Sequence, residues 1–551
     1  MKKILCGLWI LLVLCCVCGA LAGCRYRYSD ETDPQKYLSF ERLEDGTYAV
    51  TGFSDRKVKN LVIPAEHDGK RVTKVAENAF YEDLYWNPDR GAVQTLTIEE
   101  GVREIGEEAF YGCRFARMSL PDSIEIVGSE AFYEVPASFI LPASLHTADE
   151  SAFLGSGLYG DLDLNGVTFG EYAFSGTDVR SAEISSDVPD GAFFSCKKLA
   201  SLTLKEGVGK IGDSAFRGTA AEKVIFPASL TSIGASAFAE SGLTEAALSG
   251  QLGSQAFANC IALQKVTLSG NMNFGGSVFQ DCPALDTLLF SDFSSHFDAE
   301  IFQGCPLGSI VTEGDCGEYF IKDGCLTSRT DDMRLLLGGS HAFDLSGWKE
   351  IGNYAFAGRK FGTVRTGGEL KTIANGAFYR AEIEEMYVGC DLIETYAFAY
   401  AKFGKIRICA AEIASEAFKS ATFYDGTVFL EEGCRIVRES AFSMCDILTL
   451  RLPASLERAE TWAFYSVSAV YYDLREGTPI PLDTSVFCNI ISVYEQGGRY
   501  IEFSLPENFR FYVHAALYDA CKAEWDARPV FTVKNQTYVY RESLSDYLVA
   551  V

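Results

Sequence analysis

Short runs of alternating apolar and polar residues recur along most of this chain, and an Ala-Phe pair follows each run at intervals of about 22 residues. The run at 199–204 precedes Ala215-Phe216, and the run at 224–226 ends at Pro227 before Ala237-Phe238. Strict alternation predicts a short, half-buried strand, and proline marks its end because it cannot donate to a sheet ladder. A fixed period of about 20–29 residues is typical of a solenoid, in which each repeat stacks on its neighbours.

Fifteen Ala-Phe pairs keep this register, and three further positions keep the phenylalanine after Val or Ile. We expect all the marked phenylalanines to fill the coil interior as one buried spine, in which each fully buried side chain contributes roughly 1.5–3 kcal/mol. The spine comprises Phe80, Phe110, Phe132, Phe153, Phe174, Phe193, Phe216, Phe238, Phe257, Phe279, Phe302, Phe356, Phe378, Phe398, Phe418, Phe442, Phe464 and Phe487.

The rest of each coil also has an expected form. We predict a β-rich, right-handed solenoid in which the Ala-Phe pair lies on a short helical or irregular return. The glycine three or four residues before the phenylalanine is expected to supply a bend without a Cβ penalty. The alanine is expected to let the coil wall pack closely.

The opening copy carries a family resemblance. It runs through residues 43–52, then Val62-Ile63-Pro64 and 68–72, and ends at Ala79-Phe80. Together with the register of the Ala-Phe pairs, it resembles the BspA-like leucine-rich repeat proteins, a bacterial and protist family of surface proteins, over about residues 40–530. The resemblance implies a leucine-rich repeat solenoid and a role in adhesion to host matrix proteins or to other bacteria.

One insert interrupts the period, between a first repeat block at 40–302 and a second at 351–487. Within the insert at 303–350, the turn residues Asp323-Gly324 predict a hairpin, in a small meander with strand-like runs on both sides. Its simplest role is to splice the two blocks, and a binding protrusion is the alternative.

The segment at 488–551 is expected to cap the solenoid, because the last coil would otherwise expose an apolar face and an unpaired edge. A strand at 511–513 and a helix at 515–525 are predicted, since Leu517, Cys521 and Trp525 are spaced four apart. Relatives close with a similar segment that has proline where this chain has His514.

The N-terminal residues are predicted to form an export signal. Lys2 and Lys3 precede an apolar run to residue 23, which is typical of a secretory signal. An uncleaved transmembrane anchor is the alternative, since about 20 apolar residues span a bilayer. Both interpretations leave the rest of the chain outside the cytoplasm.

Leu21-Ala22-Gly23-Cys24 fits the bacterial lipobox. In that interpretation residues 1–23 are a lipoprotein signal peptide, Cys24 carries the lipid, and 24–39 form a short tether. The expected location is therefore the bacterial cell surface, with the N-terminal lipid in the membrane.

The charge is strongly acidic, with 48 Lys and Arg against 75 Asp and Glu, a net charge of −27. Without Lys2 and Lys3, 46 against 75 gives −29. Nucleic acid and anionic membrane surfaces are therefore poor partners, because both favour a basic face. The acidity either keeps an extracellular rod soluble or favours a basic partner.

Of the 18 cysteines, 13 remain after the signal and Cys24 are set aside. Six share the repeat position three residues after the phenylalanine, and buried free thiols are common, so we expect reduced structural thiols at Cys113, Cys196, Cys260, Cys282, Cys305 and Cys445. The predicted hairpin sets Lys322 opposite Cys325, which argues against a Cys316–Cys325 bridge, and that pair stays unassigned.

The sequence motifs that could indicate cofactor or metal binding are better explained as parts of the repeat. Residues 207–212 match G-x-G-x-x-G but lack a βαβ setting, and residues 161–166 resemble a calcium loop whose twelfth position is Tyr172 instead of glutamate. The five histidines have no His or Cys neighbour at zinc-ligand spacing. We therefore expect no metal, no cofactor and no enzymatic activity.

Tyrosine follows the marked phenylalanine at Tyr81, Tyr111, Tyr133, Tyr379 and Tyr465. Such a row is a candidate binding surface, because tyrosine is enriched at interface hot spots, or it packs over the adjacent coil. The favoured function is non-catalytic, adhesion-type recognition of a protein or glycan partner. The alternatives are a structural envelope scaffold without an external ligand and an enzyme whose site the repeat hides.

Overall fold

The chain forms two compact units, residues 1–221 and 222–551, so the division lies within the predicted first repeat block. In this computed structural model the described residues are 28–29, 31–54, 57–81, 93–329, 333–339, 344–464, 467–474, 478–482, 484–487, 489–495, 498–505, 508–527, 530–533, 536–539 and 543–551.

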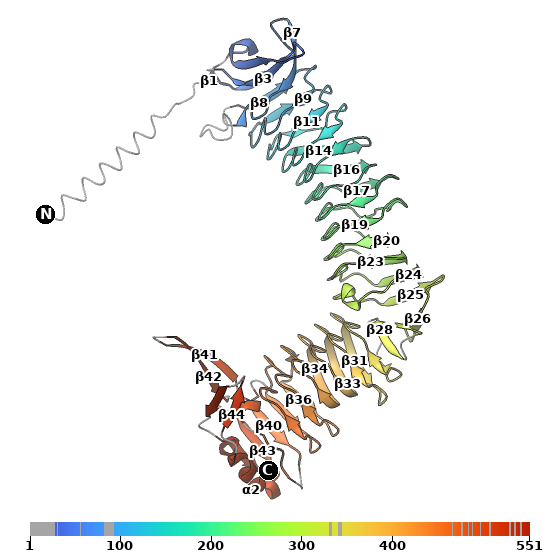
Figure 1. Ribbon diagram of the computed structural model, residues 1–551, viewed down its shortest axis with the longest axis vertical. Coiled ribbons are helices and arrows are strands. Elements are labelled where there is room, and N and C mark those ends of the chain that lie inside the picture. Colours follow the sequence, from blue (N-terminus) through green and yellow to red (C-terminus); the bar gives the residue numbers. More distant parts are fainter. Residues whose placement is uncertain are drawn as a thin grey trace, which may run out of the picture. The chain divides into compact units, whose positions relative to one another are not determined.

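The first unit is a stack of coils in which most turns of the chain contribute one longer strand and one two-residue strand (Figure 1). Its elements are β1 (Tyr28–Ser29), η1 (Pro34–Lys36), β2 (Leu38–Arg42), β3 (Tyr48–Phe53), β4 (Lys57–Val58), β5 (Asn60–Ile63), β6 (Glu66–His67), β7 (Lys70–Val75), β8 (Thr95–Ile98), β9 (Glu104–Ile105), β10 (Arg117–Ser119), β11 (Ile126–Val127), β12 (Ser138–Phe139), β13 (Thr147–Ala148), β14 (Gly157–Leu164), β15 (Thr168–Phe169), β16 (Asp178–Ile184), β17 (Ser201–Leu204) and β18 (Lys210–Ile211).

Parallel pairing joins equivalent strands of successive coils in the first unit. The longer strands form the rows β5-β8-β10 and β12-β14-β16-β17, and the shorter strands continue from β3 as β7-β9-β11-β13-β15. Strand β2 pairs antiparallel with β3 at the N-terminal edge. One hairpin strand therefore covers the edge that the first coil would otherwise expose.

The second unit repeats this plan and adds an insert and a cap. Its elements are β19 (Ser232–Ile233), β20 (Glu245–Leu248), β21 (Gln251–Leu252), β22 (Lys265–Gly270), β23 (Asn273–Phe274), β24 (Thr287–Phe293), η3 (Ala299–Phe302), β25 (Ser309–Glu313), β26 (Tyr319–Lys322), β27 (Cys325–Ser328), β28 (Arg334–Gly338), β29 (Asp344–Leu345), β30 (Glu350–Ile351), β31 (Lys360–Thr366), β32 (Thr372–Ile373), β33 (Glu382–Ile393), β34 (Lys402–Ile413), β35 (Thr422–Phe423), β36 (Thr427–Leu430), β37 (Ile436–Val437), β38 (Thr449–Leu452), β39 (Arg458–Ala459), β40 (Ala469–Tyr472), η4 (Thr484–Val486), β41 (Asn489–Glu495), β42 (Gly498–Ser504), β43 (Arg510–Val513), η5 (Ala515–Leu517), α2 (Tyr518–Asp526), β44 (Val530–Val533), β45 (Gln536–Val539), η6 (Leu544–Tyr547) and β46 (Leu548–Ala550).

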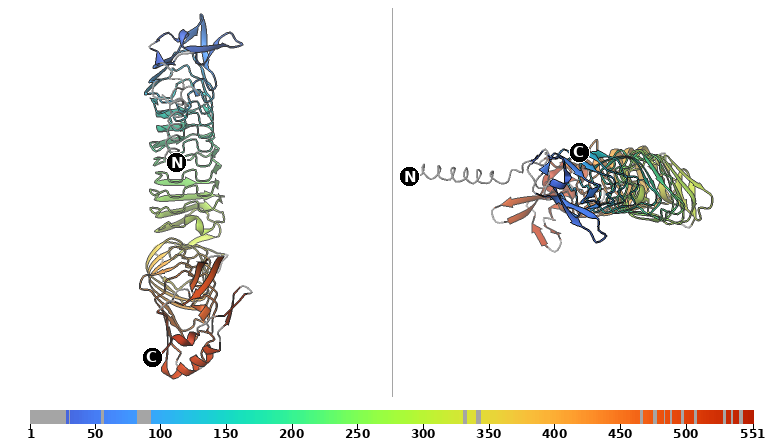
Figure 2. Two further views of the ribbon diagram at one scale, coloured as in Figure 1. Left: turned by 90° about the vertical axis from the view of Figure 1, so that its left-hand side faces the viewer. Right: turned by 90° about the horizontal axis from the view of Figure 1, so that it is seen from above.

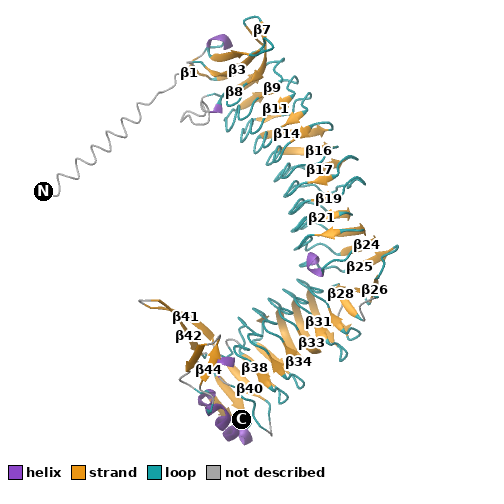
Figure 3. Cartoon of the chain, in the orientation of Figure 1, coloured by secondary structure: helices purple, strands orange, loops and turns teal. Residues whose placement is uncertain are grey.

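The predicted fold class is confirmed, because both units are β-solenoids in which helix is sparse (Figure 3). The Ala-Phe pairs lie in tight turns, whereas Ile301-Phe302 belongs to the short 3-10 helix η3, and η4 ends at Val486, directly before Phe487. A side view shows the coils of each unit stacked one upon another (Figure 2).

Left-handed residues close the turn on both sides of the Ala-Phe pair. Glu130 and Glu134 bracket Ala131-Phe132 with φ of 55° and 51°, a conformation that costs a non-glycine residue roughly 1–2 kcal/mol. The compensation is a ladder of hydrogen bonds, because the Phe132 N–H donates to the Ala152 carbonyl of the next coil at 2.9 Å. The repeated turn therefore depends on its neighbour.

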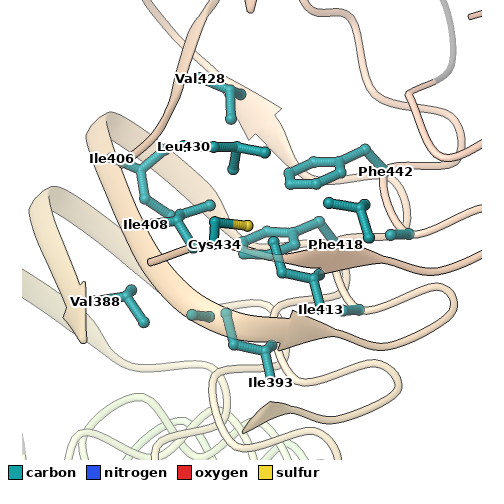
Figure 4. Packing of buried hydrophobic residues seen from close by; sticks show 14 of the residues in the cluster. Val388, Ile393, Ile406, Ile408, Ile413, Phe418, Val428, Leu430, Cys434 and Phe442 are labelled. Carbon is teal, nitrogen blue, oxygen red and sulfur yellow. The ribbon is translucent and has the colours of Figure 1, made fainter. Parts of the chain in front are cut away.

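All eighteen marked phenylalanines are buried with no exposed surface. Ring centroids of successive members lie 5.3–5.8 Å apart from Phe80 to Phe216. In the second unit the separation is 4.6–5.9 Å along Phe238–Phe302 and Phe356–Phe487. Figure 4 shows Phe418 and Phe442 packed against the inward side chains of the strands.

The glycine before the Ala-Phe pair has a different role from the one predicted. A Cβ on Gly106 would lie 2.5 Å from the backbone nitrogen of Glu77, and one on Gly128 would lie 2.7 Å from that of Glu107. Neither glycine is among the positive-φ residues. The prediction of a bend is therefore wrong at these positions, where glycine allows one coil to approach the backbone of the preceding coil.

The insert contains the predicted hairpin meander. Strands β26, β27 and β28 pair antiparallel, and Lys322 lies opposite Cys325. Cys316 and Cys325 are both buried free thiols, so no bridge joins them. Strand β28 also pairs in parallel with β30, which joins the meander to the sheet of the following coils.

The C-terminal segment extends the sheet and covers its end. Strand β43 pairs with β40 and then with β46, and α2 buries Cys521 and Trp525. The Trp525 indole donates to the Ile480 carbonyl at 2.9 Å. His514 begins η5 by accepting a hydrogen bond from the Ala516 N–H.

Candidate functional site

The predicted tyrosine row packs over neighbouring coils. Tyr111 stacks on Tyr133 with centroids 4.5 Å apart and meets Tyr81 edge-on at 5.2 Å. In the second unit Tyr379 contacts Tyr400 at 5.5 Å. These four predicted side chains, Tyr81, Tyr111, Tyr133 and Tyr379, are half-buried. Tyr465 lies outside the described residues.

The predicted lipidation site and lipobox, Cys24 with Leu21, Ala22 and Gly23, also lie outside the described residues. Among the helices that are described, none has the length and apolar character needed to cross a bilayer.

The buried cysteines have a common structural contact. Cys196, Cys260 and Cys445 each place Sγ at 3.0–3.1 Å from the carbonyl oxygen of a spine phenylalanine of another coil. Burial raises the pKa of Cys196 to about 11 and that of Cys445 to about 12. The thiols of Cys196 and Cys445 therefore stay protonated near neutral pH and are poor nucleophiles.

The residues of the glycine-rich motif at 207–212 and of the calcium-like run at 161–166 form hydrogen bonds within the solenoid. The backbone N–H groups of Gly209 and Lys210 donate to the Asp187 carboxylate at 2.7 and 2.8 Å. Asp163, in the calcium-like run, accepts from the Asn165 N–H at 3.1 Å. No group of acidic, His or Cys side chains within the described ranges could hold a metal ion.

A hollow beside the insert gathers titratable groups. Its volume is about 260 Å³, and its lining includes His296, Asp298, Glu318, Tyr319 and Arg334. Ligand pockets usually span about 300–1,000 Å³, and Arg334 already pairs with Glu350 at 2.9 Å. The residues that line this hollow therefore indicate no particular reaction.

An unusual aligned surface lies on the longer strands of the second unit. Strands β31, β33, β34, β36, β38, β40 and β43 each contribute one side chain at the same register position. In order these are Arg365, Tyr387, Arg407, Phe429, Arg451, Tyr471 and Tyr512, which we name the arginine–aromatic ladder.

Alternation along each strand puts the ladder on the solvent side. Val388, Ile408 and Leu430, each one residue beyond a ladder member, are 4 % exposed or less and point into the core (Figure 4). Successive side chains of a strand face opposite ways. Arg365, Arg407 and Arg451 are accordingly exposed, and the four aromatic members are half-buried.

Neighbouring members of the ladder are in contact through cation–π and ring–ring interactions. The Arg365 guanidinium carbon lies 4.2 Å from the Tyr387 centroid, and those of Arg407 and Arg451 lie 5.1 and 5.4 Å from that of Phe429. Arg451 also approaches Tyr471 at 5.4 Å. All are within the roughly 6 Å of a cation–π contact. Tyr471 and Tyr512 stack at 4.5 Å.

The ladder arginines differ in their acidic partners. Arg407 pairs with Glu431 at 2.9 Å, which raises the pKa of Arg407. Within the described part of the chain, no carboxylate forms an ion pair with Arg365 or Arg451. A hollow of about 680 Å³ is lined by Arg407, Phe429 and Arg451 together with the carboxylates of Glu431, Glu432 and Asp473. The central ladder is thus accessible.

Cations cluster on the same strands. Lys360, Lys402, Lys405 and Arg510 join the three ladder arginines there. Glu382 lies between Lys360 and Lys402 at 2.8 Å from each. The same strands also carry Glu384 and Glu385, and Glu385 pairs with Lys405 at 3.6 Å, so this surface mixes cations and carboxylates.

Sequence reasoning missed the ladder, although a signal was present. Consecutive members from Arg365 to Tyr471 are spaced 20 or 22 residues apart, which is the repeat period. The shared strand position is difficult to recognise in the sequence, because arginine and aromatic residues alternate there and no single residue type recurs. Comparing each slot by charge and ring content would have found the ladder.

Comparison with known families matches four segments, 73–190, 186–308, 349–471 and 411–495, to the BspA type leucine rich repeat region (6 copies). No curated protein matches the chain.

Similar solved structures include a leucine-rich repeat protein from Bacteroides ovatus, at 20 % identity over 78 % of this chain and 96 % of that one, with a TM-score of 0.44. Another is a leucine rich cell surface protein from Faecalibacterium prausnitzii, at 18 % identity over 81 % and 95 %, with a TM-score of 0.29. A leucine-rich repeat protein from Eubacterium ventriosum matches at 15 % identity over 80 % and 89 %, with a TM-score of 0.29.

The family-matched segments cover more than half of the 551 residues. The chain therefore belongs to the BspA-type leucine-rich repeat family.

Proposed function

We propose that this protein recognises a protein or glycan partner at the bacterial cell surface through the outward faces of its coils, without catalysis. The observation that carries the proposal is the arginine–aromatic ladder, in which seven side chains align on the solvent side of one sheet. Solubility requires only polar residues there. Tyrosine and arginine, by contrast, are enriched among the residues that dominate binding energy.

The proposal includes an anchor at Cys24. One acyl chain gives only marginal membrane binding, and stable attachment takes two, which a diacylglyceryl thioether on Cys24 would supply. Replacing Cys24 by Ala should abolish incorporation of labelled lipid and release the protein from the membrane fraction. Equal labelling of the Ala variant would contradict the assignment.

Recognition is tested on cells that display the full chain. Adherence to immobilised matrix proteins and polysaccharides, together with cell aggregation, is compared between the displaying strain and a strain from which the gene is deleted. The proposal expects adherence to at least one surface to fall on deletion and to return on complementation.

Two outcomes would contradict this function. Unchanged adherence and aggregation after deletion would favour a structural lipoprotein without an external ligand. Turnover of a substrate by the purified protein would show that the surface houses a catalytic site.

A further inference from the structure

We propose that the arginine–aromatic ladder binds an extended anionic polysaccharide that carries a carboxylate or sulfate on alternate sugars. This inference rests on the proposed function and narrows the partner to one chemical class.

The ring contacts leave most hydrogen-bonding groups of the arginines available, although Arg407 Nη1 already donates to Glu431 at 2.9 Å. Arg407 and Arg451 both pack on the Phe429 ring, and Arg365 packs on Tyr387. A guanidinium whose face lies on a ring keeps its N–H groups at its rim, where they form the fork that matches carboxylate or sulfate oxygens. The ladder therefore holds its cations in place before a ligand arrives.

The arginines also differ in what a ligand must displace. Arg365 and Arg451 form no ion pair among the described residues, although Asp344 is the strand-register neighbour of Arg365 and Asp473 lines the same hollow as Arg451. Arg407 holds Glu431 in an exposed ion pair, which is a weak interaction in water. An anion can therefore engage Arg365 and Arg451 without breaking an ion pair, and Arg407 by displacing Glu431.

The spacing of the charges favours an elongated ligand. Arg365, Arg407 and Arg451 occupy every second rung, and neighbouring strands lie about 4.8 Å apart, so the guanidiniums recur at roughly 10 Å. A polysaccharide with an acidic group on alternate sugars repeats its charge over a similar length. A single phosphate would occupy one rung only.

Two other polyanions fit less well. An extended acidic peptide repeats side chains on one face at roughly 6.6 Å, which falls out of step with the arginines. Single-stranded nucleic acid gains affinity by stacking its bases on open ring faces, and guanidiniums approach the ring of Phe429 from both neighbouring rungs. The Tyr387 and Tyr471 hydroxyls suit sugar hydroxyls between the charged positions.

The test uses the full chain and immobilised heparin, a sulfated polysaccharide that contains uronic acid. R365Q/R451Q should bind at least about 100-fold more weakly, since each arginine contributes about tenfold or more as a charge-assisted contact. R451K keeps the charge but loses the fork and the stack, and should weaken binding severalfold. Thermal unfolding of each variant identifies any loss of folding, and R451K then carries the test.

The matched control is R435Q/R458Q, which makes the same charge change at exposed arginines of the shorter-strand side. It should bind heparin within twofold of the unsubstituted chain. Neutral dextran should not bind, and polyglutamate should bind much more weakly than heparin.

Equal losses in the two double variants would overturn the inference, because they would indicate nonspecific charge attraction. Polyglutamate binding as tight as heparin, lost in R365Q/R451Q, would assign the ladder to acidic peptides. Absence of heparin binding by the unsubstituted chain would also overturn it, while adherence of displaying cells to another surface would leave the proposed function standing.

Discussion

The longer-strand faces of the two units share one backbone plan but present different chemistry to solvent. In the first unit, ion pairs lie on and beside β16 and β17, and β14 adds the exposed carboxylates Asp161 and Asp163. Lys198 pairs with Asp178 at 2.6 Å and Lys205 with Glu183 at 2.7 Å. In the second unit, Arg365 and Arg451 stack on rings and form no ion pair among the described residues.

This contrast separates the packing of the repeat from its recognition chemistry. The phenylalanine slot is the same in both units, because each ring must fill the same interior volume between two neighbours. The outward slot does not fill the coil interior, so it is free to carry carboxylates in one region and arginines with aromatic rings in another. Function is therefore to be sought where equivalent outward slots differ.

The largest predicted effect is on stability and concerns the phenylalanine spine, which both units share. Phe132→Ala in the first unit and Phe398→Ala in the second should each lower the free energy of unfolding by about 3–5 kcal/mol, since both rings are fully buried between stacked neighbours. Urea unfolding measures the loss. Thr203→Ala, at an exposed strand position, should stay within about 0.5 kcal/mol. A cost below about 1 kcal/mol at either phenylalanine would show that the spine is not what stabilises that unit.

A second prediction concerns the stability contributed by the position three residues after a spine phenylalanine, which different residues occupy in the two units. Cys196 and Arg359 both lie three residues after a spine phenylalanine, and both are buried. Arg359 donates Nη1 to the Ala355 carbonyl at 2.7 Å, while its Nε and Nη2 have no partner in the described structure. Arg359→Met should raise stability by about 1–4 kcal/mol, because removing a buried charge relieves its desolvation. The Ala355 carbonyl keeps its bond from Gly338.

The pH dependence of that gain has a defined sign. Burial lowers the pKa of Arg359 to about 10 from its ordinary 12.5. The cost of burying the charge is therefore fully present below pH 10 and declines only as the pH rises from about 10 towards 12.5. The advantage of Arg359→Met should be the same at pH 6 and pH 9. Cys196→Ala should instead cost about 1 kcal/mol through its lost hydrogen bond.

The sequence was most informative where one residue type recurs in one slot. The spacing of Phe110, Phe216 and Phe378 was sufficient to predict their burial, because a period and a large apolar side chain together define an interior. The role of Gly106 was not accessible in this way, since its requirement comes from the backbone of another coil at Glu77.

The ladder illustrates the other limit. Arg407 and Phe429 differ in chemistry, so their shared slot becomes evident only when the strand register places them opposite each other. The buried position of Arg359 was similarly concealed, although its distance from Phe356 equals that of Cys196 from Phe193. A sequence pattern thus predicts the positions where one residue type recurs, and the structure is needed to find positions that different residue types share.

A third prediction distinguishes the tyrosine stacks of the two units. Tyr111 contacts two ring neighbours closely, at 4.5 and 5.2 Å, whereas Tyr379 contacts Tyr400 and Tyr354 at 5.5 and 6.2 Å. Aromatic pairs contribute about 0.5–1.5 kcal/mol beyond area burial, so Tyr111→Ala should destabilise its unit more than Tyr379→Ala. Differential scanning calorimetry compares the two. Reduced adherence in a Tyr111→Ala variant with normal stability would restore the tyrosine row as a binding surface.

The smallest predicted effect concerns the ion pairs beside the ladder. The hydrogen bonds and charges of Lys360 and Lys402 lower the pKa of Glu382, whereas Glu183 in the first unit has one basic partner, Lys205. A carboxyl with a lowered folded-state pKa stabilises the fold above its unfolded pKa of about 4.5, and this contribution is lost as the pH falls through the folded value.

Because these charges are largely exposed, solvent screening limits the cost of Glu382→Gln to about 1 kcal/mol or less at pH 7. The cost should disappear in acid and shrink in high salt. Glu183→Gln should cost still less. Glu382→Gln also releases Lys360 and Lys402 beside the ladder, so heparin binding should strengthen modestly at low salt, whereas Glu183→Gln should leave it unchanged. Equal strengthening by both substitutions would show that net charge, and not the ladder region, governs the attraction.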